Sequence, residues 1–476
     1  MSWPALVALM LAGAPADVPP PLPPGVTEAL ARAPEGTRIG LVVIDAEGRE
    51  IVALRPDERF IPASNTKLFT TAAAFETLDV AVPDGAGGAT VRLEGRGTPA
   101  VVLAGHGDAR LSSAPDCRVD CLADLAAAVA QKVRAVGDVV GDDTAFPDER
   151  WPLGMSWNNM AGVYGTAISA LTLDDNVVTL TIAPGAAGTP PQVTGDGYYR
   201  IDNSATTGPV GSPRTLSFER VPGSDLLRLT GSIAEGNLPV ALSVGVDDPA
   251  HRAAWRFAQL LRAAGVKVKG RIAVRHRSLV PADDPANRGD APLAAPSEAT
   301  VLARLTPAPL SEDLRHTNKV SQNLHAELLL RRLGSSGSVA DGHAVVDALL
   351  ARAKVAKGAV ELADGAGMSS YNRVTPRATV ALLRWAATQP WGAAWRETFP
   401  VAASDGTLAR RFTGTPLAGR VWAKTGSLNA TSALAGYLTA ASGRTLAFAA
   451  YANDIPGGTS ATSAIDAALV AIAAAH

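Results

Sequence analysis

The sequence predicts an α/β fold into which a long β-rich segment is inserted. Strand-like runs and a helix open the chain, and short strand-like runs between Gly, Pro and Asn turns fill residues 177–245. From about residue 300 the pattern becomes helical again, and strand-like runs with a final helix close the chain. Its 476 residues exceed what one hydrophobic core normally serves, so this return to the opening pattern indicates inserted domains.

The opening elements are a predicted hairpin and a predicted helix. Residues 39–45 (IGLVVID) and 50–55 (EIVALR) are β-rich runs around a glycine turn. The following segment, IPASNTKLFTTAAAFETL, places apolar residues at helical spacing. We expect Ser64 or Asn65 to cap a helix that runs to about Leu78.

The later elements follow the same reasoning. A helix over 249–264 and a strand over 269–276 come after the β-rich segment. The last strands are expected at 419–428, 433–441 and 445–453, and the last helix at 463–475.

The bulk composition excludes several classes of protein. Hydrophobic residues make up 47% of the chain and charged residues 18%, which is typical of a globular protein. The net charge of −2 gives no electrostatic footprint for nucleic acid. The seven His form no HExxH pattern, and the chain has no Walker or dinucleotide-binding glycine pattern, so we expect no metal and no cofactor.

The N-terminus predicts export. Residues 3–13 (WPALVALMLAG) are an apolar run that is too short to span a membrane, and the small-x-small pattern Ala14-Pro15-Ala16 follows it. We therefore expect a signal peptide over residues 1–16, a periplasmic or extracellular location, and no transmembrane segment in the mature chain. Cys117 and Cys121 are the two cysteines; they form either a small-loop disulfide in an oxidising compartment or two free thiols.

Three short motifs carry candidate chemistry, and the first is Ser64-x-x-Lys67. Residues three apart lie on one face of a helix, so Lys67 can reach the Ser64 hydroxyl. A serine hydroxyl becomes a good nucleophile when a base takes its proton, and a desolvated lysine can be that base. Alone, the motif favours a helix cap followed by a surface lysine.

The second motif is Lys424-Thr425-Gly426, inside the strand-like run VWAKTGSL. An edge strand beside the nucleophile would offer backbone groups to an extended peptide. Lys424 would bind a substrate carboxylate, and Gly426 would let the substrate approach closely.

The third motif is Ser-x-Asn, which occurs at 156–158, 321–323, 370–372 and 427–429. The second and third copies lie between the start of the later helical region, near residue 300, and the Lys-Thr-Gly segment. We choose Ser321-Gln322-Asn323 because it follows the polar HTNKV and opens the helical run NLHAELLLRRLG. Ser321 would relay a proton to the leaving amine, and Asn323 would hold Lys67 and the substrate amide.

The three motifs in this order, with longer segments around them, resemble a known family. Those segments are GDDTAFPDERWPLGMSWNNMAGVYGTAISALTLDDN (141–176), DGAGMSSYNRVTP (364–376) and FPVAASDGTLARRF (399–412). Over nearly all of the mature chain the sequence is similar to the low-molecular-mass class C penicillin-binding proteins, the D-alanyl-D-alanine carboxypeptidase/endopeptidase family. Ala366 stands where that family usually has Ser, and Ser427 where it usually has Thr.

The resemblance implies a fold and its domains. It implies an α/β, penicillin-recognising transpeptidase (β-lactamase-like) domain with two inserted β-rich domains, one nested in the other. On this basis the catalytic domain comprises 25–88 and 296–476, the inserted domain II comprises 89–176 and 247–295, and the nested domain III comprises 177–246.

The resemblance also implies a mechanism. Ser64 would attack the carbonyl between two D-Ala residues, and the oxyanion would lie between the N–H groups of Ser64 and Ser427. Lys424 and Thr425 would face the substrate carboxylate. Asp143 would line the pocket for the side chain of the third stem-peptide residue, unless it is an ordinary turn aspartate.

The expected partners are peptidoglycan stem peptides, with β-lactam antibiotics as covalent inhibitors. The sequence leaves the balance of carboxypeptidase and endopeptidase activity open. Two alternatives are a β-lactamase or esterase on the same scaffold, for which no local sequence shows a deacylating base, and an inactive wall-binding scaffold. The intact Ser64, Lys67, Ser321, Asn323 and Lys424 argue against the inactive scaffold.

Overall fold

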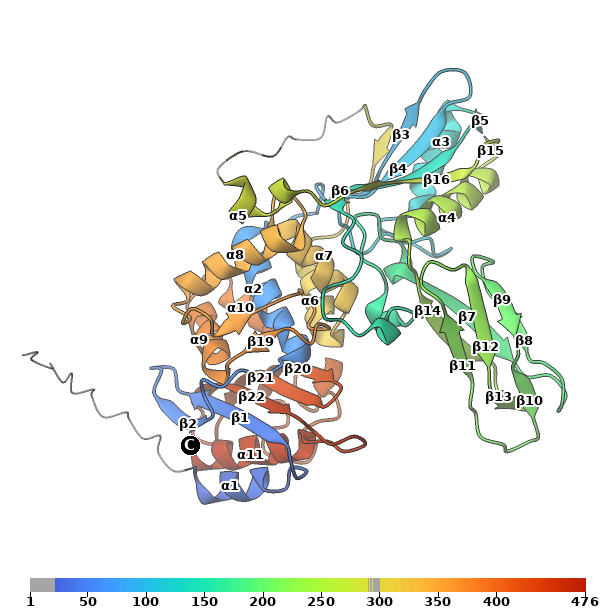
Figure 1. Cartoon of the computed structure of the whole chain (residues 1–476). Coiled ribbons are helices and arrows are strands. Elements are labelled where there is room, and N and C mark those ends of the chain that lie inside the picture. The colour runs from blue at the N-terminus through green and yellow to red at the C-terminus, as the bar shows by residue number, and fades with distance from the viewer. Residues whose placement is uncertain (1–21, 290, 292, 294–299) are drawn as a thin grey trace, which may run out of the picture.

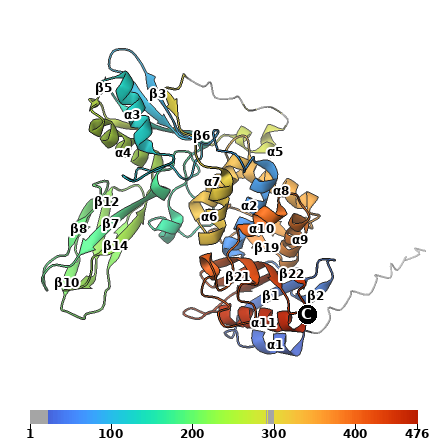
Figure 2. The same ribbon diagram turned by 180° about the vertical axis from the view of Figure 1, so that it is seen from behind.

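The computed structural model describes residues 22–289, 291, 293 and 300–476. They form a sheet with helices on both faces, a second sheet with two helices, and a small β unit that extends to the side (Figures 1 and 2). The expected signal peptide, residues 1–16, lies outside the described residues. Within the described part of the chain, no helix has the length and apolar character needed to cross a bilayer.

The first unit is built on a five-stranded sheet. Its order is β2-β1-β22-β21-β20, with bounds β1 (Arg38–Ile44), β2 (Glu50–Leu54), β20 (Val421–Leu428), β21 (Thr431–Thr439) and β22 (Thr445–Asn453). The pairing of β1 with β2 confirms the predicted hairpin. Nearly every residue of β21 and β22 is buried because helices cover both faces, which explains their almost continuous apolar sequence. The β20 strand, which carries Lys-Thr-Gly, stands at the edge.

Helices cover both faces of this sheet. One face carries α1 (Pro24–Leu30) and α11 (Thr462–Ala475), whose apolar side chains share a core with the strands. The other face carries the remaining helices of the unit: α2 (Thr66–Thr77), α6 (Leu310–Val320), α7 (Asn323–Leu333), α8 (Val339–Arg352), α9 (Pro376–Ala387) and α10 (Gly392–Glu397). Pro376 at the first turn and a Thr375 side chain that accepts from Ala378 N–H start α9.

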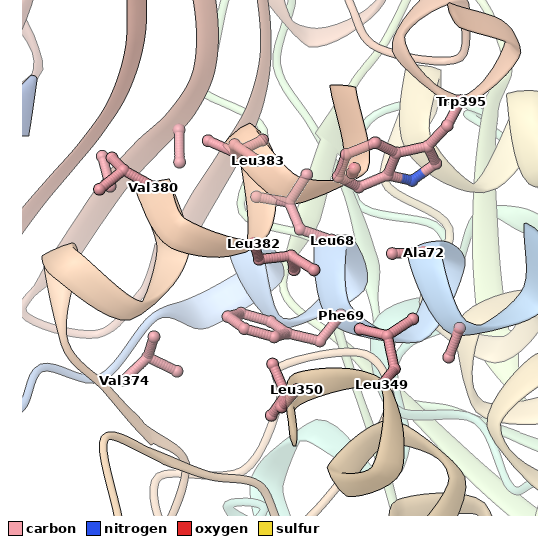
Figure 3. Packing of buried hydrophobic residues seen from close by; sticks show 14 of the residues in the cluster. Leu68, Phe69, Ala72, Leu349, Leu350, Val374, Val380, Leu382, Leu383 and Trp395 are labelled. Atoms are coloured by element: carbon pink, nitrogen blue, oxygen red, sulfur yellow. The ribbon is translucent and has the colours of Figure 1, made fainter. Parts of the chain in front are cut away.

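Helix α2 is the buried centre of this helical layer. Its Leu68, Phe69 and Ala72 have no exposed surface and lie among side chains of neighbouring helices, including Leu349 and Trp395 (Figure 3). Burial of this apolar surface fixes the position of the helix, and with it the position of the residues at its N-terminus.

The second unit is a mixed sheet in the order β16-β6-β4-β3-β17. The strands are β3 (Thr90–Glu94), β4 (Ala100–Ala104), β6 (Val139–Pro147), β16 (Ile272–Arg277) and β17 (Ala303–Arg304), and they share a core with α3 (Leu122–Lys132) and α4 (Pro249–Ala263). Further short elements are β5 (Ala135–Val136), β15 (Lys267–Val268) and α5 (Pro285–Arg288). Because β17 pairs with β3, this sheet extends past residue 295, where the sequence placed the end of domain II.

The nested unit is made of short strands. They are β7 (Val177–Ala183), β8 (Gln192–Thr194), β9 (Arg200–Asn203), β10 (Thr206–Gly208), β11 (Ser217–Arg220), β12 (Leu226–Thr230), β13 (Ser232–Ala234) and β14 (Val240–Gly245). In β7 buried and exposed residues alternate, since one face packs on a small apolar core and the other meets solvent. Figures 1 and 2 both show this unit projecting away from the first sheet.

The two cysteines are joined. Cys117 and Cys121 form a disulfide just before α3. The sequence left this open, because spacing alone cannot show whether two thiols meet.

Candidate active site

Ser64 lies on a tight turn that precedes α2. A 3₁₀ turn spans Ala63–Asn65, and Ala63 has a φ of 48°, a left-handed conformation that is uncommon for a residue with a side chain. A Cβ on Gly367 would lie 1.9 Å from the Ala63 carbonyl oxygen, so the 364–367 segment packs directly against this turn. The contact holds Ser64 half-buried at the wall of a cleft.

The structure corrects the expected helix cap. Asn65 stands at the N-cap position, but its side chain makes no cap hydrogen bond. Its Nδ2 instead donates to the Lys424 carbonyl at 2.8 Å. Asn65 therefore ties the nucleophile turn to the edge strand β20.

Lys67 is fully buried beneath Ser64. Its Nζ lies 3.1 Å from Ser64 Oγ, 2.6 Å from Asn323 Oδ1 and 2.7 Å from the Ala366 carbonyl oxygen. Burial lowers the pKa of Lys67 to about 7, against the opposing effect of the Asp364 and Glu327 carboxylates. The amine can therefore be neutral near physiological pH.

The structure brings the chosen Ser-x-Asn to the same place. Ser321 follows α6 with a left-handed φ of 65°, and its Oγ accepts from Lys424 Nζ at 2.8 Å. Asn323 begins α7 and also donates to the Tyr164 carbonyl at 3.0 Å. By contrast, the Asn372 amide of the competing copy is buried and bonds to Asp364. The copy selected from the sequence pattern, Ser321-Gln322-Asn323, is thus the one whose Asn reaches Lys67.

Lys424 completes a buried pair of lysines. Its side chain has no exposed surface, and Nζ also donates to the Thr425 carbonyl at 2.9 Å. Burial, together with the nearby Lys67, lowers the pKa of Lys424. A positive charge on Lys67 therefore disfavours protonation of Lys424.

Ser64, Ser321 and Asn323 line a cleft of about 790 Å³. Thr425 and Ser427 of β20 form one wall, and residues from the 154–164 segment form another. No side chain among the described residues that line the cleft carries a charge. They are Ile61, Ser64, Gly154, Ser156, Asn158, Asn159, Tyr164, Val320, Ser321, Asn323, Met368, Ser370, Thr407, Thr425, Ser427, Leu428, Asn429 and Thr431.

Gly426 has a different place from the one expected. It does not line the cleft; a Cβ there would meet the Pro62 carbonyl oxygen at 2.6 Å. The absence of a side chain therefore lets β20 pack against the nucleophile turn, and close approach of a substrate at Gly426 stays a prediction.

Asp143 also lies elsewhere. It is buried, accepts from Ser169 Oγ at 2.7 Å, and has its Oδ1 2.9 Å from His276 Nδ1. The structure does not bring it to the cleft, because these partners hold the carboxylate within the second unit. Asp143 is thus not among the residues that line the cleft, and its role in a substrate pocket stays a prediction.

Sequence reasoning missed the carboxylates behind Lys67. Glu327 Oε1 accepts from the N–H groups of Gly365 and Ala366, both at 2.9 Å, and Glu327 Oε2 accepts from Arg331. Asp364 accepts from Gly367, Ser369 and Asn372. The Ala366 carbonyl shares a peptide unit with Gly367 N–H, so Asp364 orients this carbonyl toward Lys67. The two preceding peptide units are held by Glu327. Its helical spacing after Asn323, one turn further along α7, is the signal that could have found it.

We expect Glu327→Gln to lower the free energy of unfolding by about 3 kcal/mol, because it leaves buried Arg331 without its charged partner. Urea unfolding followed by circular dichroism measures this change. The matched control is Glu28→Gln, since Glu28 and Arg32 form an exposed pair with the same i, i+4 spacing. The control should be indistinguishable from the native protein. Equal effects in both variants would contradict the structural role of Glu327.

Fold and site together define a class of protein. A helical Ser-x-x-Lys, a Ser-x-Asn and a Lys-Thr-Gly on an edge strand meet at one cleft, which is the arrangement of the penicillin-recognising active-site serine enzymes. Within that class, the inserted second sheet and nested β unit point to the low-molecular-mass class C penicillin-binding proteins.

Comparison with known proteins specifies the family. The sequence model of the D-Ala-D-Ala carboxypeptidase 3 (S13) family matches residues 25–476, and the chain belongs to this family. It is 36% identical over 441 residues to a D-alanyl-D-alanine carboxypeptidase of Actinomadura sp. strain R39, covering 87% of this chain and 77% of the relative. It is also 27% identical to D-alanyl-D-alanine carboxypeptidase DacB of Haemophilus influenzae, covering 90% of this chain and 88% of the relative.

A solved structure shows the same fold. Penicillin-binding protein 4 (dacB) from Haemophilus influenzae superposes with a TM-score of 0.77 at 22% identity, covering 93% of this chain and 98% of the other. The fold that the sequence resemblance implied, a transpeptidase-type domain with β-rich insertions, is thereby confirmed.

Proposed function

We propose that this D-alanyl-D-alanine carboxypeptidase is a serine enzyme that hydrolyses peptidoglycan stem peptides through an acyl-enzyme on Ser64. The observation that carries the proposal is the environment of Lys67. A neutral amine has two N–H donors and one lone pair. Asn323 Oδ1 and the Ala366 carbonyl take the two donors, which directs the lone pair to Ser64 Oγ.

Acylation follows from this geometry. Ser64 Oγ attacks the carbonyl carbon between two D-Ala residues, and its proton passes to Lys67 Nζ. The N–H groups of Ser64 and Ser427 stabilise the oxyanion. The C–N bond then breaks and Ser321 passes its proton to the leaving amine. The proton held on Lys67 replaces it on Ser321, so that Lys67 is neutral again. D-Ala departs with its own carboxylate, which faces Lys424 and Thr425.

Deacylation returns the enzyme. Water adds to the ester carbonyl, the Ser64 C–O bond breaks, and the shortened peptide leaves with a carboxylate. The same chemistry on a peptide cross-link would be endopeptidase activity. A β-lactam would also acylate Ser64: its ring would open, and no group would leave. The cleft wall at β20 suits an extended peptide, because an edge strand can pair with it.

We also propose that the protein acts outside the cytoplasmic membrane. Its substrate class lies there, and the Cys117–Cys121 disulfide fits an oxidising compartment. The apolar run at the N-terminus would direct export.

The test uses the native protein with a soluble pentapeptide that ends in D-Ala-D-Ala, and with benzylpenicillin. We expect stoichiometric release of D-Ala and a mass increase of one antibiotic on the intact protein. Rapid hydrolysis of the antibiotic without a lasting adduct, and without D-Ala release, would indicate a β-lactamase instead. No reaction with either compound would contradict the catalytic proposal and favour a wall-binding scaffold.

A further inference from the structure

The 399–412 segment carries none of the three catalytic motifs, but it reaches the catalytic cleft through Thr407. Thr407 lies in the short 3₁₀ turn Gly406–Leu408, is exposed, and lines the cleft. Its Oγ1 accepts a hydrogen bond from the Thr425 hydroxyl at 2.8 Å. Thr425 belongs to the Lys-Thr-Gly motif and lines the same cleft. The two hydroxyls therefore form a pair on the β20 wall.

The turn that carries Thr407 is held against α6. Asp405 accepts a hydrogen bond from Lys319 Nζ. A Cβ on Gly406 would lie 2.4 Å from the Lys319 carbonyl oxygen, so the turn packs directly on the end of α6. Ser321 follows two residues after Lys319. Thr407 is therefore fixed between β20 and the segment that places Ser321, and the ion pair neutralises Asp405, the carboxylate nearest to Thr407 in sequence.

The cleft offers a substrate carboxylate no charged side chain at its surface. The described residues that line it are all uncharged. Lys424 has no exposed surface, and its Nζ donates to Ser321 Oγ and to the Thr425 carbonyl. The Lys424 amine therefore acts on a carboxylate from beneath the surface, and the groups that touch the carboxylate are neutral donors. A hydroxyl with a free proton is suited to this task, because a hydrogen bond to a charged acceptor is stronger than one between neutral groups.

The hydroxyl pair has one such proton. A hydroxyl group carries a single proton to donate. One of the two protons lies between the two oxygens, and the other stays free whichever oxygen is the donor; with Thr425 donating, the free proton is that of Thr407. Among the described residues, neither hydroxyl has another hydrogen-bond partner. The bond within the pair also strengthens a second bond to a ligand, because hydrogen bonds in a chain polarise one another.

We propose that Thr407, together with Thr425, binds the terminal carboxylate of the stem peptide. The identity of the substrate rests on the proposed function; the free proton rests on the hydroxyl pair. Thr407 is then a specificity-determining residue, which favours peptides with a free carboxylate on the leaving residue over peptides in which that group is an amide. Removal of one hydroxyl frees the proton of the other, so each threonine partly replaces its partner.

The test compares two soluble pentapeptides, one that ends in D-Ala-D-Ala and one that ends in D-Ala-D-alaninamide and lacks the carboxylate. The variants are Thr407→Val, Thr425→Val and the double variant, since valine keeps the shape of threonine and removes the hydroxyl. The measured quantity is the ratio of kcat/KM for the acid peptide to kcat/KM for the amide peptide. We expect each single variant to lower this ratio by about tenfold or less and the double variant by about 10²-fold, because only the double variant has no threonine hydroxyl for the carboxylate.

The matched control is Thr459→Val, because Thr459 is exposed in the same unit and its hydroxyl donates to the Pro456 carbonyl, away from the cleft lining. This control should keep the native ratio. A double variant whose ratio equals that of Thr425→Val would overturn the inference, because Thr407 would then add nothing. Equal losses on the acid and amide peptides would contradict it as well, since they would indicate a purely structural role.

A binding measurement separates this inference from the proposed function. Isothermal titration calorimetry on Ser64→Ala protein, with and without the two threonine changes, compares the affinities for both peptides without turnover. We expect Ser64→Ala to bind the acid peptide more tightly than the amide peptide, and this preference to disappear when both threonines are replaced. No preference in Ser64→Ala, or a preference that survives the double change, would refute the role of Thr407. Absence of D-Ala release from the native protein would refute the proposed function, and the binding comparison would still decide the role of Thr407.

Discussion

Ser64→Ala should abolish D-Ala release from a soluble pentapeptide, with a loss of about 10⁴-fold or more in kcat/KM. The reason is that the variant lacks the hydroxyl that lies 3.1 Å from Nζ of Lys67, the buried amine proposed as its base. The variant should also give no mass increase with benzylpenicillin, because the acyl group has no oxygen to join. Released D-Ala and intact mass are the two readouts.

The fold should survive this change. Ser64 is half-buried, and Lys67 keeps its contacts with Asn323 and Ala366 when the hydroxyl is removed. The matched control is Ser370→Ala, since Ser370 also lines the cleft but its hydroxyl donates to the Gly154 carbonyl. The control should stay within about tenfold of the native rate. A Ser64→Ala enzyme that matches this control would refute the acyl-enzyme mechanism.

Lys67→Arg is expected to lower kcat/KM by about 10²–10⁴-fold, the usual contribution of a general base. The native rate should rise with pH through about 7, where the Lys67 amine loses its proton, and level off above it. The sign follows from the mechanism, because only the neutral amine can accept the Ser64 proton. An arginine stays protonated throughout this range, so kcat/KM of the variant should no longer rise with pH through about 7.

The measurement is kcat/KM for D-Ala release between pH 5 and 9. Lys67→Met serves as a second variant of similar length without a charge, in case the guanidinium does not fit the fully buried site. Lys132→Arg, an exposed substitution at the end of α3, is the matched control and should keep the native profile. If kcat/KM of Lys67→Arg still rises with pH through about 7, another group is the base.

Ser64 lies at the surface of a cleft whose lining carries no charged side chain among the described residues, and Lys67 is buried beneath it. The charged groups of the site lie below the surface, as the buried lysines Lys67 and Lys424 with the carboxylates Glu327 and Asp364 behind Lys67. A group in such a setting is sensitive to small changes in its surroundings, because the low dielectric screens charges weakly. The proton affinity of Lys67 is therefore a property of the whole packed layer around α2.

What the sequence alone determined is local or strongly patterned. Ser64 and Lys67 are three residues apart on one helix turn, so their contact needs only helical geometry. The hairpin of β1 and β2 and the strands β20 to β22 follow from runs of apolar residues between turns. The resemblance to the class C family rests on segments of many residues, which is why it predicted the fold.

Tertiary structure decided the contacts between distant parts of the chain. Lys67 and Asn323 are 256 residues apart, and only the packing of α2 against α7 makes Asn323, and not Asn372, its partner. Other long-range contacts place Gly426 against the nucleophile turn and hold Asp143 with Ser169 and His276. The groups of a buried site come from surfaces that are far apart in the sequence. Burial and hydrogen bonding act between these surfaces only once the layers have packed, so the packing decides which groups meet.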